Sequence, residues 1–284
     1  MTADKLMLGR NLAKRTLEGA AEKVRTIEKQ SGVTPCLATV IVGDDPASHT
    51  YVKMKRKRCV DAGMKPVRVE LPLGTTTEEL VGHIDTLARD DSVHGILLQH
   101  PVPAPIDRRA AFEVIPQSKD VDGVTSATLG RVILGLPGFV PCTPLGIMRL
   151  LEEYMVHMDG AHATVIGRSP ILGRPMASLL INAHATVTLC HSRTKNLPDL
   201  VRHADIVIAA VGKPKFVQGG WIKDGAVVVD AGYNEGNIGD VDLNSAIERC
   251  SMITPVPGGV GPMTIATLID QTADAAAAQL EVNI

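Results

Sequence analysis

The chain has 284 residues, of which 45% are hydrophobic and 21% are charged, and its formal net charge is −2. This length allows two domains, and the composition is ordinary for a soluble globular protein. A charge so close to zero gives no global reason to expect nucleic acid or an anionic membrane as a partner.

The N-terminal segment and the cysteines indicate the cellular compartment of the protein. Residues 1–20 lack the apolar core of a secretory signal, and no apolar run is long enough to span a bilayer. The five cysteines form no CxxC pair and no zinc-ligand spacing, so we predict no disulfide and no metal site. The sequence therefore predicts a cytoplasmic protein.

The first half of the chain alternates helices and strands. An apolar stripe over residues 8–27 predicts an opening helix, and "CLATVIVG" predicts a buried parallel strand over 36–43. The next helix is expected to have Asp45 as its cap, Pro46 at its first position and Gly63 at its end. The following elements are expected to be a strand over 65–72, a helix over 75–90 and a strand over 94–101. This order predicts a parallel sheet with helices on both faces.

Residues 101–145 lack periodicity and are rich in Pro and Gly, so we expect long loops and a domain boundary there. The predicted domains are 1–142 and 143–284, with the C-terminal helix packing back on the first.

The second half resumes the alternation, beginning with a helix over 143–156 that Thr143 is expected to cap. The later elements are expected to be strands over 162–167, 186–190, 205–212, 226–233 and 251–256, and helices over 174–183, 197–204, 242–250 and 263–280. The predicted fold is α/β, with two parallel-sheet domains joined by long helices around a cleft. The second domain is expected to be a Rossmann-type dinucleotide-binding domain.

A glycine-containing turn, "GRSPILGRP", follows the first strand of the second domain. Its glycines are Gly167 and Gly173, which is not the GxGxxG spacing. The turn still lets the backbone approach a pyrophosphate at a helix N-terminus. On this motif alone, a dinucleotide site and an ordinary strand–helix turn are equally good interpretations.

The residues near the next strand indicate which dinucleotide would bind. An NAD site expects an acidic residue there, but "CHSRT" offers Ser192 and Arg193 instead. Arg168 and Ser169 lie in the first turn. Two cations and two hydroxyls suit a 2′-phosphate, so NADP is favoured over NAD if a dinucleotide binds. The alternative is that these arginines pair with surface carboxylates.

The most basic segment, "SHTYVKMKRKRC" at residues 48–59, lies on the helix after the first strand. A charge run of this kind is usually a solvated helix face. Helical spacing nevertheless puts Ser48, Tyr51 and Lys55 on one stripe, while the other four cations face elsewhere or flank it. A lysine among other cations has its charged form disfavoured, which is one route to a usable acid or base.

Two further candidates lie where α/β sites are built. Gln99 ends the strand "GILLQ", and ligands bind beyond the carboxyl ends of parallel strands. Asp122 lies in "KDVDG", for which we favour a functional role, whereas Asp120 is predicted to be a turn residue.

Several motifs together resemble the bifunctional methylenetetrahydrofolate dehydrogenase/cyclohydrolase family. "PGGVGPMTI" at residues 257–265 is similar to the closing signature of that family. The segments "SHTYVKMKRKRC", "GILLQHP", "KDVDG", "PCTP", "GRSPILGRP", "HSRT" and "GDV" follow the order and spacing of the family. The resemblance implies oxidation of 5,10-methylenetetrahydrofolate by NADP⁺ and then hydrolysis of the methenyl product to 10-formyltetrahydrofolate.

The resemblance also implies roles for the candidate residues. Lys55 would be the acid/base group of the cyclohydrolase step, held by Gln99. Tyr51 would pack along the folate and Asp122 would bond the pterin.

The remaining sites implied by the resemblance concern the substrate, the cofactor and the assembly. The folate–nicotinamide junction would be lined by Pro257, Gly258 and Gly259. The NADP site would comprise Gly167, Arg168, Ser169, Gly173, Ser192 and Arg193. The family is usually a homodimer formed through the cofactor domain.

Two positions depart from the pattern of the family, His100 after the glutamine and Tyr233 in "DAGYN". Because His100 adjoins Gln99, a second interpretation is a dehydrogenase with weak cyclohydrolase activity. A third is a catalytically silent NADP- or folate-binding regulator. Four intact candidate residues argue against it: Tyr51, Lys55, Gln99 and Asp122. Without the resemblance, the sequence indicates an NADP-dependent oxidoreductase of unknown substrate.

Overall fold

The computed structural model describes residues 3–284, and it divides into two compact units. The five-stranded unit comprises the described residues up to 13, together with 131–137 and 141–264. The three-stranded unit comprises 14–130, 138–140 and 265–284. The long helices α1 (Arg10–Ser31) and α10 (Val260–Gln279) each have residues in both units. The functional boundary after residue 142 stays a prediction.

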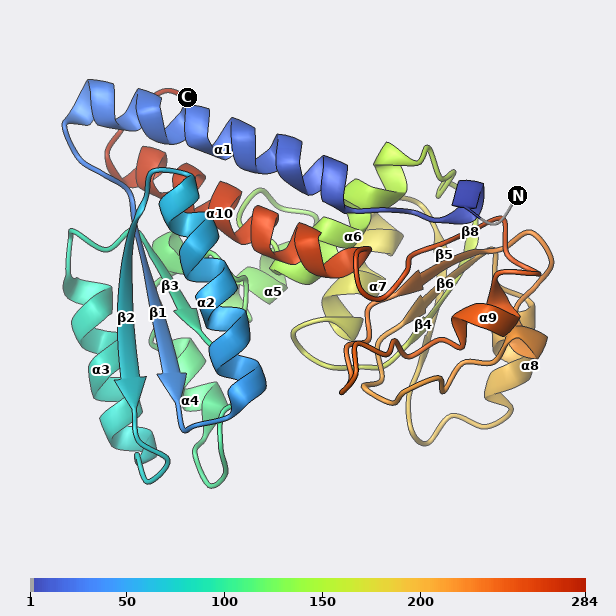
Figure 1. The fold of residues 1–284 in the computed structure, drawn as a ribbon. Helices are drawn as coiled ribbons and strands as arrows, with labels where there is room; N and C mark the ends of the chain where they lie inside the picture. Colours follow the sequence, from blue (N-terminus) through green and yellow to red (C-terminus); the bar gives the residue numbers. More distant parts are fainter. Residues whose placement is uncertain (1–2) are drawn as a thin grey trace. The chain divides into compact units, whose positions relative to one another are not determined.

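The three-stranded unit is built on a parallel sheet of order β2-β1-β3. Its central strand is buried along its whole length, as the continuous apolar run predicts. In Figure 1, α2 lies over the face of this sheet that is turned to the viewer. The elements are β1 (Cys36–Val42), α2 (Pro46–Asp61), β2 (Lys65–Leu71), α3 (Thr77–Arg89) and β3 (Gly95–Leu98).

Local signals explain where α2 begins and ends. The Asp45 carboxylate accepts a hydrogen bond from the Ser48 backbone N–H at 2.8 Å, and Pro46 occupies the first turn. Gly63 follows the helix with a φ of +86°, which a residue with a Cβ rarely adopts. The predicted cap, first residue and stop are therefore confirmed.

The expectation of long loops over residues 101–145 is wrong in part. Helix α4 (Arg108–Glu113) forms there, because the Asp107 carboxylate caps it by accepting from the Arg109 and Ala110 N–H groups at 2.8 and 3.2 Å. A single 3₁₀ turn, η2 (Gln117–Lys119), and helix α5 (Ser126–Ile133) follow. Helices this short complete too few turns to show a hydrophobic period.

Two predicted helix starts also need correction. Helix α1 begins at Arg10 rather than at Leu8, because the preceding segment pairs with β8 (Met252–Ile253), with the Met7 N–H donating to the Ile253 carbonyl at 2.8 Å. Thr143 does not cap α6 (Cys142–Glu153), which starts one residue earlier. Its hydroxyl lies 3.1 Å from the Thr264 hydroxyl instead.

The five-stranded unit has a wholly parallel sheet of order β5-β4-β6-β7-β8. Because β5 lies on one side of β4 and β6 on the other, the strand order reverses next to β4. The strands are β4 (His162–Ile166), β5 (Thr186–Cys190), β6 (Ile206–Ala209), β7 (Val227–Asp230) and β8. The helices are α6, α7 (Gly173–Asn182), α8 (Leu197–Arg202) and α9 (Leu243–Ala246), with 3₁₀ turns η1 (Ala3–Lys5) and η3 (Gly219–Trp221).

The core of this unit is aliphatic, as the low aromatic content predicts. Val207, Val228 and Ile253 have no exposed surface, and burying each such side chain contributes about 1.5–3 kcal/mol. Helix α9 and strand β8 are shorter than predicted. Within residues 3–284, no helix is both long and apolar enough to cross a membrane.

Candidate functional site

The three-stranded unit brings the predicted Tyr51, Lys55 and Gln99 together. Lys55 is only 6% exposed, and its Nζ donates to the Gln99 Oε1 at 3.0 Å. The same Nζ lies 4.7 Å from the centroid of the Tyr51 ring, within the range of a cation–π contact. Gln99 follows β3 directly, so this buried amine is held at the carboxyl end of an edge strand of the parallel sheet.

The Gln99 amide has a defined orientation. Its Nε2 donates to the His100 carbonyl oxygen at 2.6 Å, which turns Oε1 toward Lys55. The His100 ring packs edge-on against Phe112, with ring centroids 5.0 Å apart. Burial, with Arg108 and Lys55 nearby, lowers the pKa of His100 to about 4. His100 is therefore neutral at pH 7 and adds no second cation beside Lys55.

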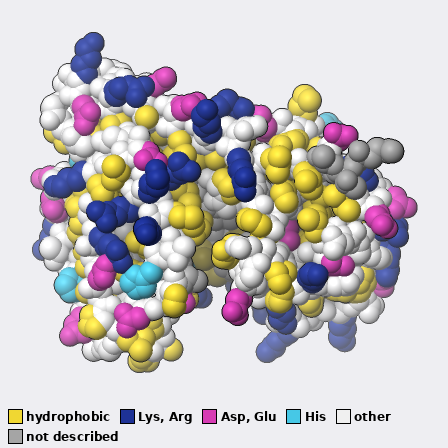
Figure 2. All heavy atoms as spheres, in the orientation of Figure 1, with side chains coloured by type: hydrophobic (Ala, Val, Ile, Leu, Met, Phe, Trp, Pro, Cys, Tyr) yellow, Lys and Arg dark blue, Asp and Glu magenta, His cyan; other side chains and the backbone are white. Residues whose placement is uncertain are grey.

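The other four cations of the basic segment are exposed, as the helical spacing predicts. Lys57 forms a surface ion pair with Asp61 at 2.8 Å, and Arg58 lies near the same carboxylate. Figure 2 shows Lys and Arg side chains gathered over the part of α2 that is turned to the viewer. These side chains form a solvated face.

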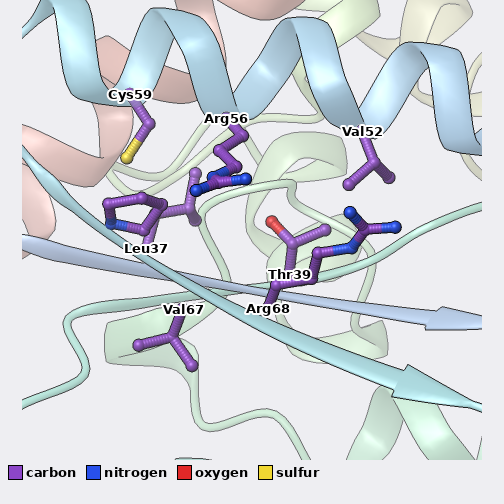
Figure 3. A pocket seen from close by; sticks show the side chains of 8 residues that line it. Leu37, Thr39, Val52, Arg56, Cys59, Val67 and Arg68 are labelled. Carbon is purple, nitrogen blue, oxygen red and sulfur yellow. The ribbon is translucent and has the colours of Figure 1, made fainter.

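A shallow hollow lies beside a different stripe of α2. Arg56 from the helix and Arg68 from β2 both reach toward it, with Thr39 of β1 between them (Figure 3). Its remaining lining residues are Leu37, Val52, Cys59, Pro66 and Val67. Neither Tyr51 nor Lys55 lines this hollow, so it is separate from the Lys55–Gln99 pair.

Asp120 organises the turn that carries Asp122. Its fully buried carboxylate accepts hydrogen bonds from Val124, Thr125 and Thr128 at 2.6–3.0 Å. Burial raises the pKa of the Asp120 carboxyl, although the hydrogen bonds that it accepts act to lower this pKa. The interpretation of Asp120 as a turn residue is confirmed. Asp122 is half-buried in the same turn, and its role stays a prediction.

The turn after β4 has the close backbone packing that a dinucleotide site needs. A Cβ at Gly167 would collide with the carbonyl oxygen of Ala210, the first residue after β6. A Cβ at Gly173, the first residue of α7, would collide with the carbonyl oxygen of Gly167. The turn therefore lies where the strand order reverses and leads into a helix N-terminus, which suits a pyrophosphate.

The predicted phosphate-binding side chains lie in the segments that follow β4 and β5 at this end of the sheet. Arg168 and Arg193 are exposed, and neither guanidinium has an ion-pair or hydrogen-bond partner among residues 3–284. Ser169 is half-buried in the turn, and Ser192 is exposed after β5. These groups fit the phosphates of NADP. Arg174, which was not predicted as a site residue, is an exposed third cation here, and its Nε donates to the Arg168 carbonyl at 3.3 Å.

The segment of Pro257, Gly258 and Gly259 forms a tight turn immediately before α10. Gly258 has a φ of +110°, and its carbonyl accepts from the Gly9 N–H at 2.9 Å. A Cβ at Gly259 would press on Thr254 at 2.7 Å. This geometry explains the two glycines, while a role in substrate binding stays a prediction.

Two buried carboxylates were not predicted as site residues. Asp230 ends β7 and is 4% exposed, and Asp240 has no exposed surface. The sequence signal was the "GDV" segment, which the resemblance included without a role. No group of three or more His, Cys, Asp or Glu side chains in the described part of the chain is placed to hold a metal ion.

Comparisons with known proteins cover almost the whole chain. Residues 7–122 match the model of the tetrahydrofolate dehydrogenase/cyclohydrolase catalytic domain, and residues 141–280 match that of its NAD(P)-binding domain. The bifunctional protein FolD 1 of Streptomyces avermitilis is 58% identical over 278 residues, which cover 98% of this chain and 97% of that protein.

Solved structures are similar over the same extent. The bifunctional FolD of Campylobacter jejuni has a TM-score of 0.93 at 46% identity, covering 96% of this chain and 98% of that one. The Trypanosoma brucei enzyme, solved with NADP and an inhibitor, has a TM-score of 0.92 at 37% identity, covering 96% and 97%.

Proposed function

This chain belongs to the tetrahydrofolate dehydrogenase/cyclohydrolase family, and on that premise we propose how its residues perform two reactions. It oxidises 5,10-methylenetetrahydrofolate to the methenyl compound with NADP⁺. It then hydrolyses the methenyl compound to 10-formyltetrahydrofolate, a step of one-carbon metabolism.

The buried Lys55–Gln99 pair is the single observation that carries the cyclohydrolase assignment. Opening the methenyl bridge requires a water molecule to attack and a proton to be moved at the same centre. Lys55 is 6% exposed, and its Nζ lies 3.0 Å from the Oε1 of the oriented Gln99 amide. A buried amine held in this way is suited to move that proton. Tyr51, in contact with the Lys55 amine, would pack along the aminobenzoyl ring.

The dehydrogenase step requires the protein to bind and orient the folate and the cofactor, and it requires no nucleophilic side chain. Bound NADP⁺ supplies the hydride acceptor. The Gly167 and Gly173 turn would receive the pyrophosphate, and Arg168 and Arg193, with Ser169 and Ser192, would hold the 2′-phosphate. The unpartnered guanidiniums support this assignment.

Two substrate contacts complete the proposal. Asp122 would accept hydrogen bonds from the amino group and ring N–H of the pterin, for which a carboxylate is the matching acceptor. The turn of Pro257, Gly258 and Gly259, which leads directly into α10, would contact the folate.

Replacing Lys55 by Met tests the proposal directly. Methionine matches the apolar stem of lysine but lacks the amine and cannot carry a proton, so we expect the cyclohydrolase kcat to fall about 100-fold or more. Folate binding should be largely retained. Lys53→Met is the matched control, because Lys53 is exposed on the same helix. Parental hydrolysis by Lys55→Met would show that another group moves the proton.

The alternative of a dehydrogenase with weak cyclohydrolase activity rests on His100. The pKa of His100, lowered to about 4, keeps the ring uncharged at pH 7, and its carbonyl helps to orient Gln99. His100 therefore supports the Lys55–Gln99 pair, and full cyclohydrolase activity is the better interpretation.

We also propose a homodimer that forms through the five-stranded unit. Ile133, Leu134 and Ile181 are 56–72% exposed, and β5 is an edge strand that carries the exposed Leu189. The Asn182 side chain donates to the Val132 carbonyl at 2.8 Å. Because these two residues adjoin Ile181 and Ile133, the hydrogen bond brings Ile133, Leu134 and Ile181 close together. Sedimentation equilibrium measures the mass in solution. A mass of twice 30.1 kDa would support the dimer, and a mass of 30.1 kDa would refute it.

We propose further that the protein works in a reducing cytoplasm and that its partners are small molecules. All five cysteines lie in the described part of the chain, where they are buried and form no disulfide. The net charge of −2 gives no electrostatic reason to bind nucleic acid.

A further inference from the structure

We propose that Asp240 is a positioning residue for the dinucleotide site, and that Asp230 holds it in place. The inference rests on the proposed NADP-dependent function and adds to it two carboxylates of the five-stranded unit. Both lie in or beside the loops that follow β6 and β7, at the carboxyl end of the sheet.

Asp240 shapes the loop that follows β6. Its Oδ2 accepts from the backbone N–H groups of Val211 and Gly212 at 2.6 and 2.9 Å, and its Oδ1 accepts from Lys213 at 2.9 Å. Hydrogen bonds to a charged acceptor are among the strongest in proteins. Three successive N–H groups are thereby drawn onto one buried carboxylate, although Gly212 and Lys213 themselves are exposed. The loop conformation therefore depends on Asp240.

Asp230 fixes the backbone of Asp240 in turn. Its Oδ1 accepts from the Asp240 N–H at 2.9 Å, and its Oδ2 accepts from the Val241 N–H at 2.9 Å. A third bond comes from the Gly232 N–H at 2.9 Å. The strand end of β7 thus sets the place of Asp240, which sets the loop after β6.

Two glycines make room for these carboxylates. A Cβ at Gly232 would collide with the Asp240 carboxyl group, and a Cβ at Gly239 would collide with the Asp230 carboxyl group. Both residues have ordinary, non-left-handed backbone angles, so glycine is required here for space. The two carboxylates and the two glycines form one tightly packed unit.

This unit lies beside the cofactor turn. The loop held by Asp240 begins at Ala210, whose carbonyl oxygen touches the position that a Cβ of Gly167 would occupy. Ligands of open parallel sheets bind where the strand order reverses, here between β4 and β6. Residues 211–213 therefore form the second wall of the crevice, opposite the turn of Gly167 and Gly173.

The variant Asp240→Asn tests the inference. The amide keeps the volume but turns an NH₂ group toward N–H donors, so at least one of the bonds to residues 211–213 is lost. We expect the Kd for NADP⁺, measured by titration calorimetry, to rise about tenfold, the scale of one hydrogen bond to a charged group. Cyclohydrolase activity, which uses Lys55 of the other unit, should stay within about twofold of the parent because it needs no hydride acceptor.

Asp205→Asn is the matched control. The Asp205 carboxylate accepts from the His162 N–H at 2.9 Å, just before β6 and at the opposite end of the same sheet. Both the Kd for NADP⁺ and the cyclohydrolase rate should remain parental. Asn234→Ala removes a side-chain donor that lies 3.1 Å from Asp240 and 3.0 Å from the Ile238 carbonyl. It is a milder second variant and should raise the Kd about twofold.

The outcomes separate this inference from the proposed function. A selective rise in Kd supports the inference, whereas an unchanged Kd in Asp240→Asn overturns it. If Asp240→Asn does not fold, an unchanged Kd in Asn234→Ala overturns it. Equal losses of NADP⁺ binding and cyclohydrolase activity also overturn it, because they indicate general unfolding. A parent that binds NADP⁺ without oxidising methylenetetrahydrofolate refutes the proposed dehydrogenase function while leaving this test intact.

Discussion

Gln99 offers the sharpest test of how the buried lysine is controlled. The variant Gln99→Met removes the acceptor 3.0 Å from the Lys55 amine and the donor 2.6 Å from the His100 carbonyl. A hydrogen bond to a charged group contributes about 1.5–3 kcal/mol. At about 1.4 kcal/mol per factor of ten, the cyclohydrolase kcat/KM should fall by about 10- to 150-fold. The loss of methenyl absorbance with time measures this rate.

The variant Gln99→Glu separates orientation from proton transfer. A carboxylate can still accept from Lys55, but its charge favours the protonated amine and raises the lysine pKa. Hydrolysis should therefore also slow, with recovery toward high pH that Gln99→Met does not show. Gln117→Met is the control, because Gln117 is exposed in the same unit. Parental hydrolysis by Gln99→Met would refute the reasoning.

Two more predictions concern the five-stranded unit. Arg193→Ala should raise the KM for NADP⁺ about tenfold, which is the scale of one charge-assisted hydrogen bond. The KM for NAD⁺ should change little. Equal losses for both cofactors would exclude a contact between Arg193 and the 2′-phosphate. Burial raises the pKa of Asp230 to about 6 even though three backbone N–H groups favour its charged form. The unfolded chain releases this proton near pH 4, so the stabilising contribution of Asp230 is complete below pH 4 and is lost as the pH rises to about 6. Titration of its carboxyl carbon by NMR should give a midpoint near 6, and a midpoint near 4 would contradict the prediction.

Helical spacing was enough to select Tyr51 and Lys55 from a run of cations. Positions four apart must share a face, and the structure places this pair together. Gln99 followed from a second general rule, that sites form at the carboxyl ends of parallel strands. These predictions succeeded because each depends on local geometry that the sequence determines.

The sequence could not predict the features that depend on distant contacts. Asp240 meets the Val211 N–H across 29 positions of the chain, and no periodic pattern marks such a pair. Thr143 was assigned as a cap from its type alone, but its hydroxyl meets Thr264 instead. His100 stood out only as a departure from the family pattern, and its burial in the fold, with Arg108 and Lys55 nearby, explains why it stays neutral.

A steady-state assay of the unmodified protein with 5,10-methylenetetrahydrofolate and each of NADP⁺ and NAD⁺ tests the proposed function most directly. We predict NADP⁺-dependent oxidation followed by release of 10-formyltetrahydrofolate, with kcat/KM for NADP⁺ at least about tenfold above that for NAD⁺. Binding of NADP⁺ without turnover, or accumulation of the methenyl compound without hydrolysis beyond the spontaneous rate, would contradict it.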